Sequence, residues 1–329
     1  MTERHVVAIA EQSQVGAARR LAQDLARSHG FDEGAAGRVG IAVTEAGTNI
    51  VKHGGGGQIL LRAGAAGVGL IALDRGPGMT NVSHAMRDGY STAGTPGTGL
   101  GSIVRQASAF DIFSAPGRGT VVVAEFRRRE GAAVENGFRV GGVAVPKRGE
   151  EECGDGWAFV RQAGRALLLV ADGLGHGPSA ALASHKAIEV LQNRAADPIT
   201  SIVERMHEAL RPTRGAAVGL AEIDPGRGRL AFAGVGNIAG SIVADSTFRS
   251  VVSHHGTLGH DVRKIQEFSY PWPRGAVLVM HSDGLTSKWG LEAYPGLIQR
   301  DPALVAAVLY RDFQRGNDDT TVVVVREAA

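Results

Sequence analysis

The sequence predicts a two-domain α/β protein, with an α/β sandwich over residues 1–130 and a mainly antiparallel β-rich domain over residues 137–329. The chain has 329 residues, which is enough for two domains that each bury a core of their own. Helical and strand-like patterns alternate in the first part, whereas strand-like runs dominate the second. Residues 131–136 lie between them without apolar periodicity, and we expect them to be a linker.

The first domain is expected to begin with a strand at residues 5–10 and a helix that Ser13 caps and Gly30 ends. A second helix is expected from Asp32, because apolar residues then recur at helical spacing and would face a core. These residues are Val39, Val43, Ala46 and Ile50. Later patterns predict strands at 58–62, 68–74, 111–114 and 120–127, with a helix that ends at Ala109.

The second domain is expected to contain two stacked antiparallel sheets with flanking helices. Its predicted strands are residues 138–145, 157–162, 166–170, 216–223, 229–233, 276–281 and 321–326. Two helices are predicted at residues 178–193 and 198–210. Each begins with a proline, which is tolerated in the first helical turn because that position has no N–H partner to lose.

Composition excludes several function classes. The formal net charge is +2, without the basic excess of a nucleic-acid binder. Apolar runs reach only strand length, and the N-terminus lacks the apolar stretch of a signal peptide. A single cysteine, Cys153, excludes an internal disulfide framework and suits a reducing compartment. We therefore expect a cytoplasmic protein that binds neither nucleic acid nor membrane.

Three polar residues of the second predicted helix could handle a phosphate. Glu45, Asn49 and His53 follow one another at intervals of four, so in an α-helix they project from one side. A carboxylate there can deprotonate a hydroxyl, and an amide oxygen can bind Mg²⁺. Taken alone, however, the three residues fit an ordinary solvated helix face better.

Glycine-rich turns follow in the same domain. Asp74-Arg-Gly76-Pro-Gly78 comes directly after a strand, and residues 94–101 open a helix with alternating glycines. Backbone N–H groups of such a turn bind phosphate oxygens without a lysine. With 47 glycines in the chain, however, about one G-x-G-x-G string arises by chance, so the motif alone is not specific.

The ordered series is more informative than its parts. Glu45-x3-Asn49-x3-His53, Asp74-x-Gly76-x-Gly78, Gly97-x-Gly99-x-Gly101 and Gly119-Thr120 together resemble the N, G1 and G2 boxes of the GHKL ATPase/kinase superfamily. Asp88-Gly-Tyr-Ser-Thr92 is similar to the RsbT-type switch kinases. The resemblance implies a GHKL (Bergerat) α/β sandwich that binds ATP and Mg²⁺.

The same resemblance implies a role for each matching residue. Glu45 would be the catalytic base, Asn49 the Mg²⁺ ligand and Asp74 the acceptor of the adenine amino group. Residues 80–98 would form the ATP lid. The implied nucleotide-binding residues are Asn49, His53, Asp74, Gly76, Gly78, Gly97, Thr98, Gly99, Leu100, Gly101 and Thr120.

Aspartates at strand ends mark the second domain. Asp155, Asp172 and Asp283 each precede a glycine, and Asp318-Asp319 precede the last predicted strand. Taken singly, each Asp-Gly pair is more often a hairpin turn than a ligand. Carboxylates gathered at one rim would repel each other unless cations lay between them, and oxygen ligands favour Mg²⁺ or Mn²⁺. Two such ions form a phosphatase site.

These motifs resemble the metal-dependent Ser/Thr phosphatase (PPM) family, with the SpoIIE/RsbX branch as the best match. The matching strings are Asp172-Gly-Leu-Gly-His-Gly177, Ser282-Asp283-Gly284 and Asn317-Asp318-Asp319-Thr320. The resemblance implies an α-β-β-α sandwich in which Asp172 bridges two metals and the Gly173 carbonyl completes one shell. Asp283 and Asp318 would bind the first ion and Asp155 the second or a third. Asp319 remains the alternative to Asp318.

Together the two resemblances imply a bifunctional enzyme, a Ser/Thr kinase joined to a metal-dependent phosphoserine/phosphothreonine phosphatase with Asp172 and Asp283 as catalytic residues. Its expected partner is a STAS-domain antagonist or stressosome scaffold protein, and a homodimer is possible. The alternative is a phosphatase that a non-catalytic, ATP-sensing or partner-binding GHKL domain regulates. No certain counterpart of the phosphate-binding arginine of some relatives is evident, and Arg148 is only a candidate.

Overall fold

The computed structural model describes residues 3–86, 99–128, 137–162, 164–244 and 247–328. The chain divides into two compact units, Met1–Val134 and Glu135–Ala329. The predicted linker at residues 131–136 lies outside the described residues.

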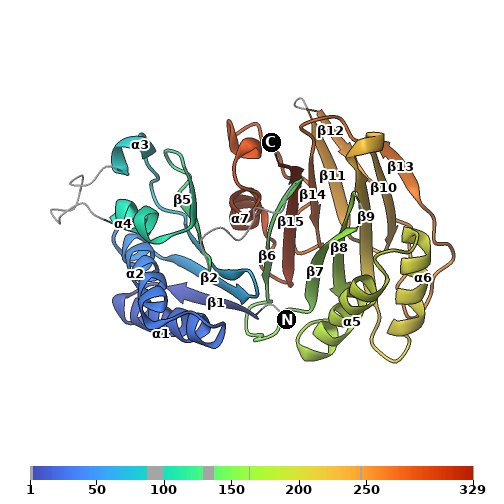
Figure 1. Cartoon of the computed structure of the whole chain (residues 1–329), viewed down its shortest axis with the longest axis horizontal. Helices are drawn as coiled ribbons and strands as arrows, with labels where there is room; N and C mark the ends of the chain where they lie inside the picture. The colour runs from blue at the N-terminus through green and yellow to red at the C-terminus, as the bar shows by residue number, and fades with distance from the viewer. Residues whose placement is uncertain (1–2, 87–98, 129–136, 163, 245–246, 329) are drawn as a thin grey trace. The chain divides into compact units, whose positions relative to one another are not determined.

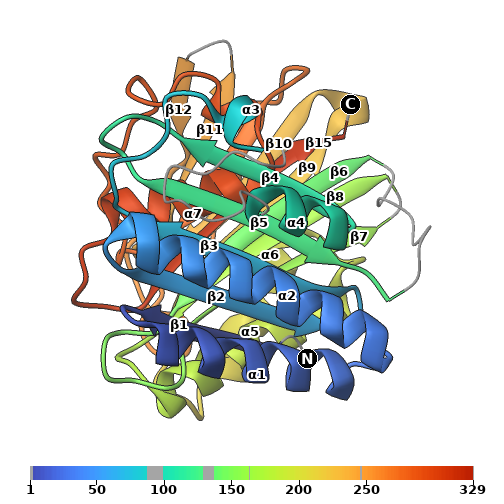
Figure 2. The ribbon, with the colours of Figure 1, turned by 90° about the vertical axis from the view of Figure 1, so that its left-hand side faces the viewer.

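The first unit is an α/β sandwich. Its sheet contains β1 (Glu3–Ile9), β2 (Gly57–Gly64), β3 (Gly67–Asp74), β4 (Ala109–Ser114) and β5 (Thr120–Phe126) in the order β1-β2-β3-β5-β4, and all neighbours are antiparallel. Helices α1 (Gln12–Ser28) and α2 (Glu33–Asn49) cover one face of the sheet (Figure 2). Two shorter helices are α3 (Val82–Ala85) and α4 (Gly99–Gln106).

The ends of these helices differ in part from the prediction. Asp32 caps α2 as expected, because its carboxylate accepts the Ala35 N–H at 2.7 Å. The cap of α1 is Glu11 rather than Ser13, since the Gln14 side chain reaches back to the Glu11 N–H at 3.1 Å. Helix α4 ends at Gln106, three residues before the predicted end, because Ala109 already belongs to β4.

Helix α2 does not continue as an α-helix through His53. It passes at Ile50 into a π-helical turn, Ile50–Gly54. This turn widens the helix, so His53 leaves the period of four that places Glu45 and Asn49 on one side. The predicted buried stripe is confirmed, because Val39, Val43, Ala46 and Ile50 are all in the core.

The second unit stacks two antiparallel sheets between helices (Figure 1). One sheet has the order β13-β10-β9-β8-β7 and the other β12-β11-β14-β15-β6. The first consists of β7 (Asp155–Gln162), β8 (Arg165–Gly173), β9 (Ala216–Asp224), β10 (Arg229–Val235) and β13 (Phe268–Pro271). The second consists of β6 (Phe138–Val145), β11 (Ala239–Ala244), β12 (Thr247–Ser250), β14 (Val277–His281) and β15 (Thr320–Glu327).

Helices α5 (Pro178–Arg194) and α6 (Ile199–Leu210) pack on the first of these sheets, and α7 (Pro302–Phe313) packs on the second (Figure 1). The α-β-β-α sandwich is therefore as expected, although the sequence prediction omitted α7. Pro198 lies at the N-cap of α6 rather than in its first turn. The short strands β11, β12 and β13 were also missed.

Two apolar clusters hold the second unit together. One lies between the sheets and includes Leu168, Phe232 and Val323. The other joins a sheet to α5 and α6 through residues such as Leu169, Leu191 and Met206. Because both sheets are buried on two faces, their central strands read as continuous apolar runs, which explains why the sequence showed them clearly.

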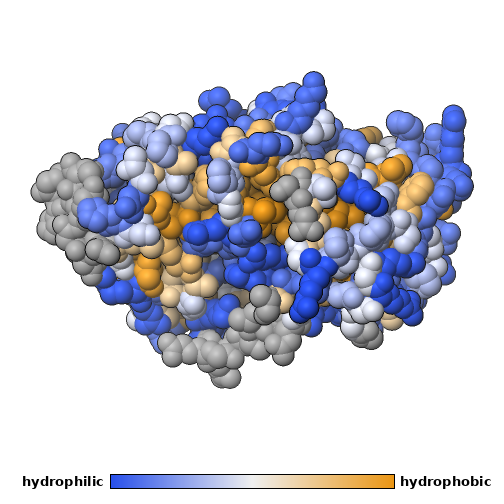
Figure 3. Space-filling model, turned by 90° about the horizontal axis from the view of Figure 1, so that it is seen from above, coloured by the Kyte–Doolittle hydropathy of each residue, from blue (hydrophilic) through white to orange (hydrophobic). Residues whose placement is uncertain are grey.

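Within the described residues, no helix combines the length and the apolar character needed to cross a bilayer. Hydrophilic side chains cover much of the face drawn in Figure 3, and apolar side chains show between them. The large exposed apolar residues are Ile41, Val104, Leu174, Leu182, Phe248 and Val252.

Candidate active sites

The first candidate site begins at the open end of the β7–β8 hairpin. Antiparallel pairing places Asp155 directly opposite Asp172. Asp155 is only 3% exposed, and its Oδ2 accepts a hydrogen bond from Ser282 Oγ at 2.6 Å. Ser282 Oγ in turn accepts the Thr321 N–H at 2.9 Å. One hydroxyl thus ties together the ends of β7, β14 and β15, which all carry acidic residues.

Three carboxylates line one cavity at these strand ends. Asp172, Asp283 and Asp318 border a cavity of about 530 Å³. The Asn237 side chain lies at the same cavity and donates from Nδ2 to Asp283 Oδ2 at 2.7 Å. The remaining lining residues are Lys147, Leu174, Gly175, His176, Ala217, Gly236, His255, Gly256 and Thr257.

The electrostatics of this cluster favour a bound cation. Burial raises the pKa of Asp172 to about 7, and repulsion from Asp283 and Asp318 adds to the rise. Burial, with repulsion from Asp172, also raises the pKa of Asp155 well above its usual range. Holding all these carboxylates ionised is therefore costly unless positive charge lies between them.

The donor set suits hydrated divalent ions rather than a closed cage of side chains. Among the described residues, no three His, Cys, Asp or Glu side chains converge closely enough to hold an ion by themselves. Mg²⁺ keeps several waters and uses only one or two carboxylates, so carboxylates spaced around a cavity fit it. Gly173, the predicted carbonyl ligand, ends β8 where a Cβ would overlap the Ala180 carbonyl oxygen.

The two adjacent aspartates before β15 differ in their surroundings. Asp318 lines the cavity. Asp319 is 3% exposed, and its two carboxylate oxygens accept the backbone N–H groups of Lys147 at 2.7 Å and Gly154 at 3.0 Å. This difference favours Asp318 as the metal ligand and gives Asp319 a structural task.

The second candidate site lies in the first unit, around Asp74. The Asp74 Oδ1 atom accepts the Gly76 N–H at 2.8 Å and the Thr120 N–H at 3.2 Å. The Thr120 hydroxyl lies 3.0 Å from Ser114 Oγ. A Cβ on Gly76 would lie 2.5 Å from the His53 carbonyl oxygen, so glycine is required where this loop meets the π-helical turn. The structure thus brings Asp74, Gly76, Thr120 and the backbone of His53 together.

Glu45 and Asn49 lie together beside the start of α4. A Cβ on Gly99 would lie 3.2 Å from Glu45 Oε2 and 3.4 Å from Asn49 Oδ1. The N-terminus of α4, with Gly99, Leu100 and Gly101, therefore faces the polar side of α2. His53 is exposed, and it lies in the π-helical turn beyond Glu45 and Asn49. Gly97, Thr98 and residues 87–96 of the predicted lid lie outside the described residues.

Comparison with known families identifies both units. A model described as histidine kinase-like ATPase domain matches residues 8–126. A model described as stage II sporulation protein E (SpoIIE) matches residues 162–327, which is just over half of the chain. The chain belongs to the SpoIIE family. Its second unit is a PPM-type Ser/Thr phosphatase domain, and its first unit is a kinase-like ATPase domain.

Two proteins of Bacillus subtilis (strain 168) resemble the two units of this SpoIIE-family chain. Serine/threonine-protein kinase RsbT is 34% identical over 128 residues, which cover 38% of this chain and 96% of RsbT. Phosphoserine phosphatase RsbX is 28% identical over 142 residues, which cover 42% of this chain and 70% of RsbX. The resemblance to RsbT-type and RsbX-type proteins expected from the motifs is confirmed.

Solved structures agree with the fold. A chain from work described as "The bacterial stressosome: a modular system that has been adapted to control secondary messenger signaling" is 28% identical, with a TM-score of 0.55. The alignment covers 57% of this chain and 99% of that one. The crystal structure of RsbX in complex with magnesium is 21% identical, with a TM-score of 0.51 over 60% of this chain and 98% of RsbX.

In the SpoIIE-family unit, His281 directly precedes Ser282 and Asp283. It is only 3% exposed, and burial lowers its pKa. Its Nε2 accepts the Trp289 indole N–H at 3.1 Å, and its Nδ1 lies 2.8 Å from the Ser282 carbonyl oxygen. His281 is therefore a neutral packing residue. His176, by contrast, lines the cavity and lies 2.6 Å from Glu150 Oε1.

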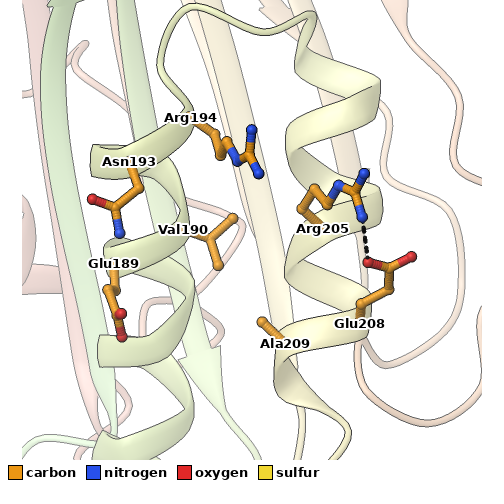
Figure 4. A pocket seen from close by; sticks show the side chains of 7 residues that line it. All are labelled: Glu189, Val190, Asn193, Arg194, Arg205, Glu208 and Ala209. Atoms are coloured by element: carbon orange, nitrogen blue, oxygen red, sulfur yellow. Dashed lines mark hydrogen bonds and ion pairs between the residues drawn. The ribbon is translucent and has the colours of Figure 1, made fainter.

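A second pocket of the SpoIIE-family unit lies between α5 and α6 (Figure 4). Its volume is about 380 Å³. Val190 and Ala209 lie between the helices, while Arg205 pairs with Glu208 on its own helix at 2.9 Å. Because its charged groups are exposed and the acidic cluster lies elsewhere, this pocket has no part in the chemistry described above.

Proposed function

We propose that this chain is a bifunctional partner-switching enzyme. Its first unit transfers the γ-phosphoryl group of MgATP to a serine or threonine of a partner protein, and its second unit hydrolyses the same kind of phosphoester. The observation that carries the phosphatase half is the cavity that Asp172, Asp283 and Asp318 line together. The similarity to a kinase and to a phosphatase in separate units supports the combination.

In the phosphatase unit, Asp172, Asp283, Asp318 and Asp155 would hold Mg²⁺ or Mn²⁺, with the Gly173 carbonyl as a further ligand. Such ions neutralise a phosphoryl group and lower the pKa of a water molecule that serves as nucleophile. Asn237 fixes the orientation of the Asp283 carboxylate through its 2.7 Å hydrogen bond. Ser282 does the same for Asp155 through its 2.6 Å hydrogen bond.

In the kinase-like unit, Asp74 would accept a hydrogen bond from the adenine amino group, and Asn49 would bind the Mg²⁺ of MgATP. Glu45 would accept the proton of the attacking hydroxyl. Its position beside Asn49 and Gly99 supports this role, because the N-terminus of a helix is where backbone N–H groups bind phosphate. Mere nucleotide binding does not require such a carboxylate.

The proposed partner is a STAS-domain antagonist or a stressosome scaffold protein in the cytoplasm. The similarity to RsbT and to a chain from work on the bacterial stressosome supports this choice. The first unit would phosphorylate such a partner, and the second would hydrolyse the phosphoester. A single chain would then set the fraction of the partner that is phosphorylated.

The phosphatase half is tested by hydrolysis of p-nitrophenyl phosphate with Mn²⁺. Asp172→Asn keeps the size of the side chain but removes its charge, so hydrolysis is expected to fall to background. Asp197→Asn is the matched control, because the Asp197 side chain is 37% exposed, does not line the cavity and lies 3.8 Å from Arg194. Undiminished hydrolysis in Asp172→Asn would refute the metal assignment.

The kinase half is tested with γ-labelled ATP and purified STAS proteins in the Asp172→Asn background, where label is not erased. Glu45→Gln is expected to abolish transfer while ATP binding persists. Glu33→Gln is the control, because Glu33 lies at the other end of the same helix and pairs with Arg27. If the Asp172→Asn chain binds ATP without transferring label, and hydrolysis by the unmodified chain follows the ATP concentration, the first unit is a regulatory sensor instead.

A further inference from the structure

Lys147 lines the cavity that Asp172, Asp283 and Asp318 border. Among the described residues that line the catalytic cavity, it is the one lysine and there is no arginine. The neighbouring Arg148, which the sequence suggested as a phosphate-binding candidate, is exposed and does not line the cavity. The chain therefore places a lysine, and not that arginine, beside Asp172, Asp283 and Asp318.

Hydrogen bonds to Asp319 hold the loop that carries Lys147. The Lys147 N–H donates to Asp319 Oδ1 at 2.7 Å, and the Gly154 N–H donates to Asp319 Oδ2 at 3.0 Å. Asp319 directly follows the cavity residue Asp318 and is itself 3% exposed. A buried carboxylate that accepts two backbone N–H groups fixes both segments. The backbone of Lys147 is thus fixed by Asp319, and this contact does not use the Lys147 side chain.

The Lys147 ammonium group has no competing partner. The residue is half-buried, and within the described part of the chain it makes no ion pair. A lysine at a cavity bordered by carboxylates would ordinarily pair with one of them. Once divalent ions engage those carboxylates, the negative group left for Lys147 to bind is a phosphate.

We propose that Lys147 binds the phosphoryl oxygens of the phosphoserine or phosphothreonine substrate and of the inorganic phosphate product. This inference rests on the proposed phosphatase function and assigns its anion-binding side chain. An ammonium is a compact point charge without the fixed geometry of a guanidinium, so it can contact phosphate in both substrate and product. Lys147 therefore contributes to binding more than to the chemical step.

The test is steady-state hydrolysis of p-nitrophenyl phosphate by the Mn²⁺-loaded full chain, with inorganic phosphate as competitive inhibitor. In Lys147→Ala, KM and the inhibition constant of phosphate should both rise about 10-fold, because a charged hydrogen bond is lost, while kcat stays within about 2-fold. Lys147→Arg should keep both constants close to those of the parent. Arg148→Ala is the matched control and should change neither.

Two further measurements separate this role from others. The Mn²⁺ concentration for half-maximal activity and the melting temperature should be unchanged in Lys147→Ala, because its backbone contact with Asp319 remains. Unchanged KM and phosphate inhibition in that variant would overturn the proposal. A decrease in kcat alone in Lys147→Ala would also overturn it, because that result would indicate a proton donor. So would a rise in KM in Arg214→Ala but not in Lys147→Ala, because the Arg214 guanidinium lies beside Gly175 and could bind the phosphate instead.

Failure of the proposed function itself gives a different result. If the parent chain hydrolyses no phosphoester, the phosphatase assignment is wrong. Calorimetric titration of the Mn²⁺-loaded chain with inorganic phosphate needs no turnover and still decides the role of Lys147. Binding that weakens about 10-fold in Lys147→Ala but not in Arg148→Ala supports it, and equal binding by all three chains refutes it.

Discussion

The candidate sites of the two units differ in what surrounds them. The first unit relies on backbone in close contact, where a Cβ on Gly78 or Gly119 would overlap the carbonyl oxygen of Ala115 or Asp74. The second unit relies on side-chain charge, with Asp172 and its neighbours crowded around one cavity. Substitutions that add side-chain volume should therefore impair the first site most, and substitutions that remove a carboxylate charge should impair the second site most.

The largest effect should follow from removing one charge at the cavity. Asp283→Asn keeps the shape of the side chain but removes its charge, and it replaces one of the two oxygens, either the proposed metal ligand or the acceptor of the Asn237 amide, with an NH2 donor. Mn²⁺-dependent hydrolysis should fall by at least about 100-fold, whereas ATP affinity, measured by calorimetry, should not change.

The control for that prediction is Asp261→Asn, because Asp261 is exposed and does not line the cavity. A comparable loss in the control, or a loss of ATP binding in Asp283→Asn, would show that the two sites are not separate as the comparison requires.

Added volume is tested with two glycines of one loop. Gly117 and Gly119 both have positive φ angles, of 72° and 66°. A Cβ on Gly117 meets nothing within 4 Å, whereas one on Gly119 overlaps the Asp74 carbonyl oxygen. Gly117→Ala should cost about 1–2 kcal/mol from backbone strain alone, and Gly119→Ala about 1–3 kcal/mol more from overpacking. Urea unfolding and ATP titration measure the difference, and equal costs would contradict the close-contact account.

A smaller effect is expected from pH at the acidic cavity. The pKa of Asp172 is raised to about 7, so the folded chain without metal binds a proton there that the unfolded chain has already lost. This contribution to stability is present below pH 4 and is lost as pH rises through about 7. Mn²⁺ must displace the proton, so its dissociation constant should rise about 10-fold between pH 8 and pH 6. A pH-independent constant would contradict this.

The smallest effects should come from matched helix caps in the two units. Asp32 caps α2 through the Ala35 N–H at 2.7 Å, and Asp301 caps α7 through the Ala303 N–H at 2.9 Å. Replacing either with Ala should cost about 1 kcal/mol. Asp32→Ala should weaken ATP binding, and Asp301→Ala should leave it unchanged. Urea unfolding measures the loss of stability, and calorimetry measures the ATP affinity. A reversed pattern would contradict the separation of the units.

Much of the fold could be predicted because its signals are local. Apolar strands such as β8 are buried on both faces and end in Asp-Gly, so both the strand and its terminal carboxylate are visible in the sequence. Helix α7 could not be recognised in the same way. Its residues 302–311 are all buried, so it has no polar face and its apolar run lacks the helical period.

Parts of the candidate sites depend on contacts that no pattern encodes. The π-helical turn at Ile50–Gly54 changes hydrogen-bond partners within one helix, so the spacing of Glu45, Asn49 and His53 suggested a single face. Asp318 and Asp319 are chemically identical in the sequence, and only the backbone groups that surround Asp319 distinguish them. Lys147 gave no sequence signal because its position depends on that same contact.

The direct pairing of Asp155 with Asp172 has a consequence for how the proposed metal site forms. Two of its carboxylates belong to one short hairpin, so they approach each other as soon as those two strands align. A slip of a single residue would turn one of them to the opposite face of the sheet. Correct alignment of β7 and β8 is therefore a precondition for Mn²⁺ binding, which also needs Asp283 and Asp318 beside the strands of the other sheet.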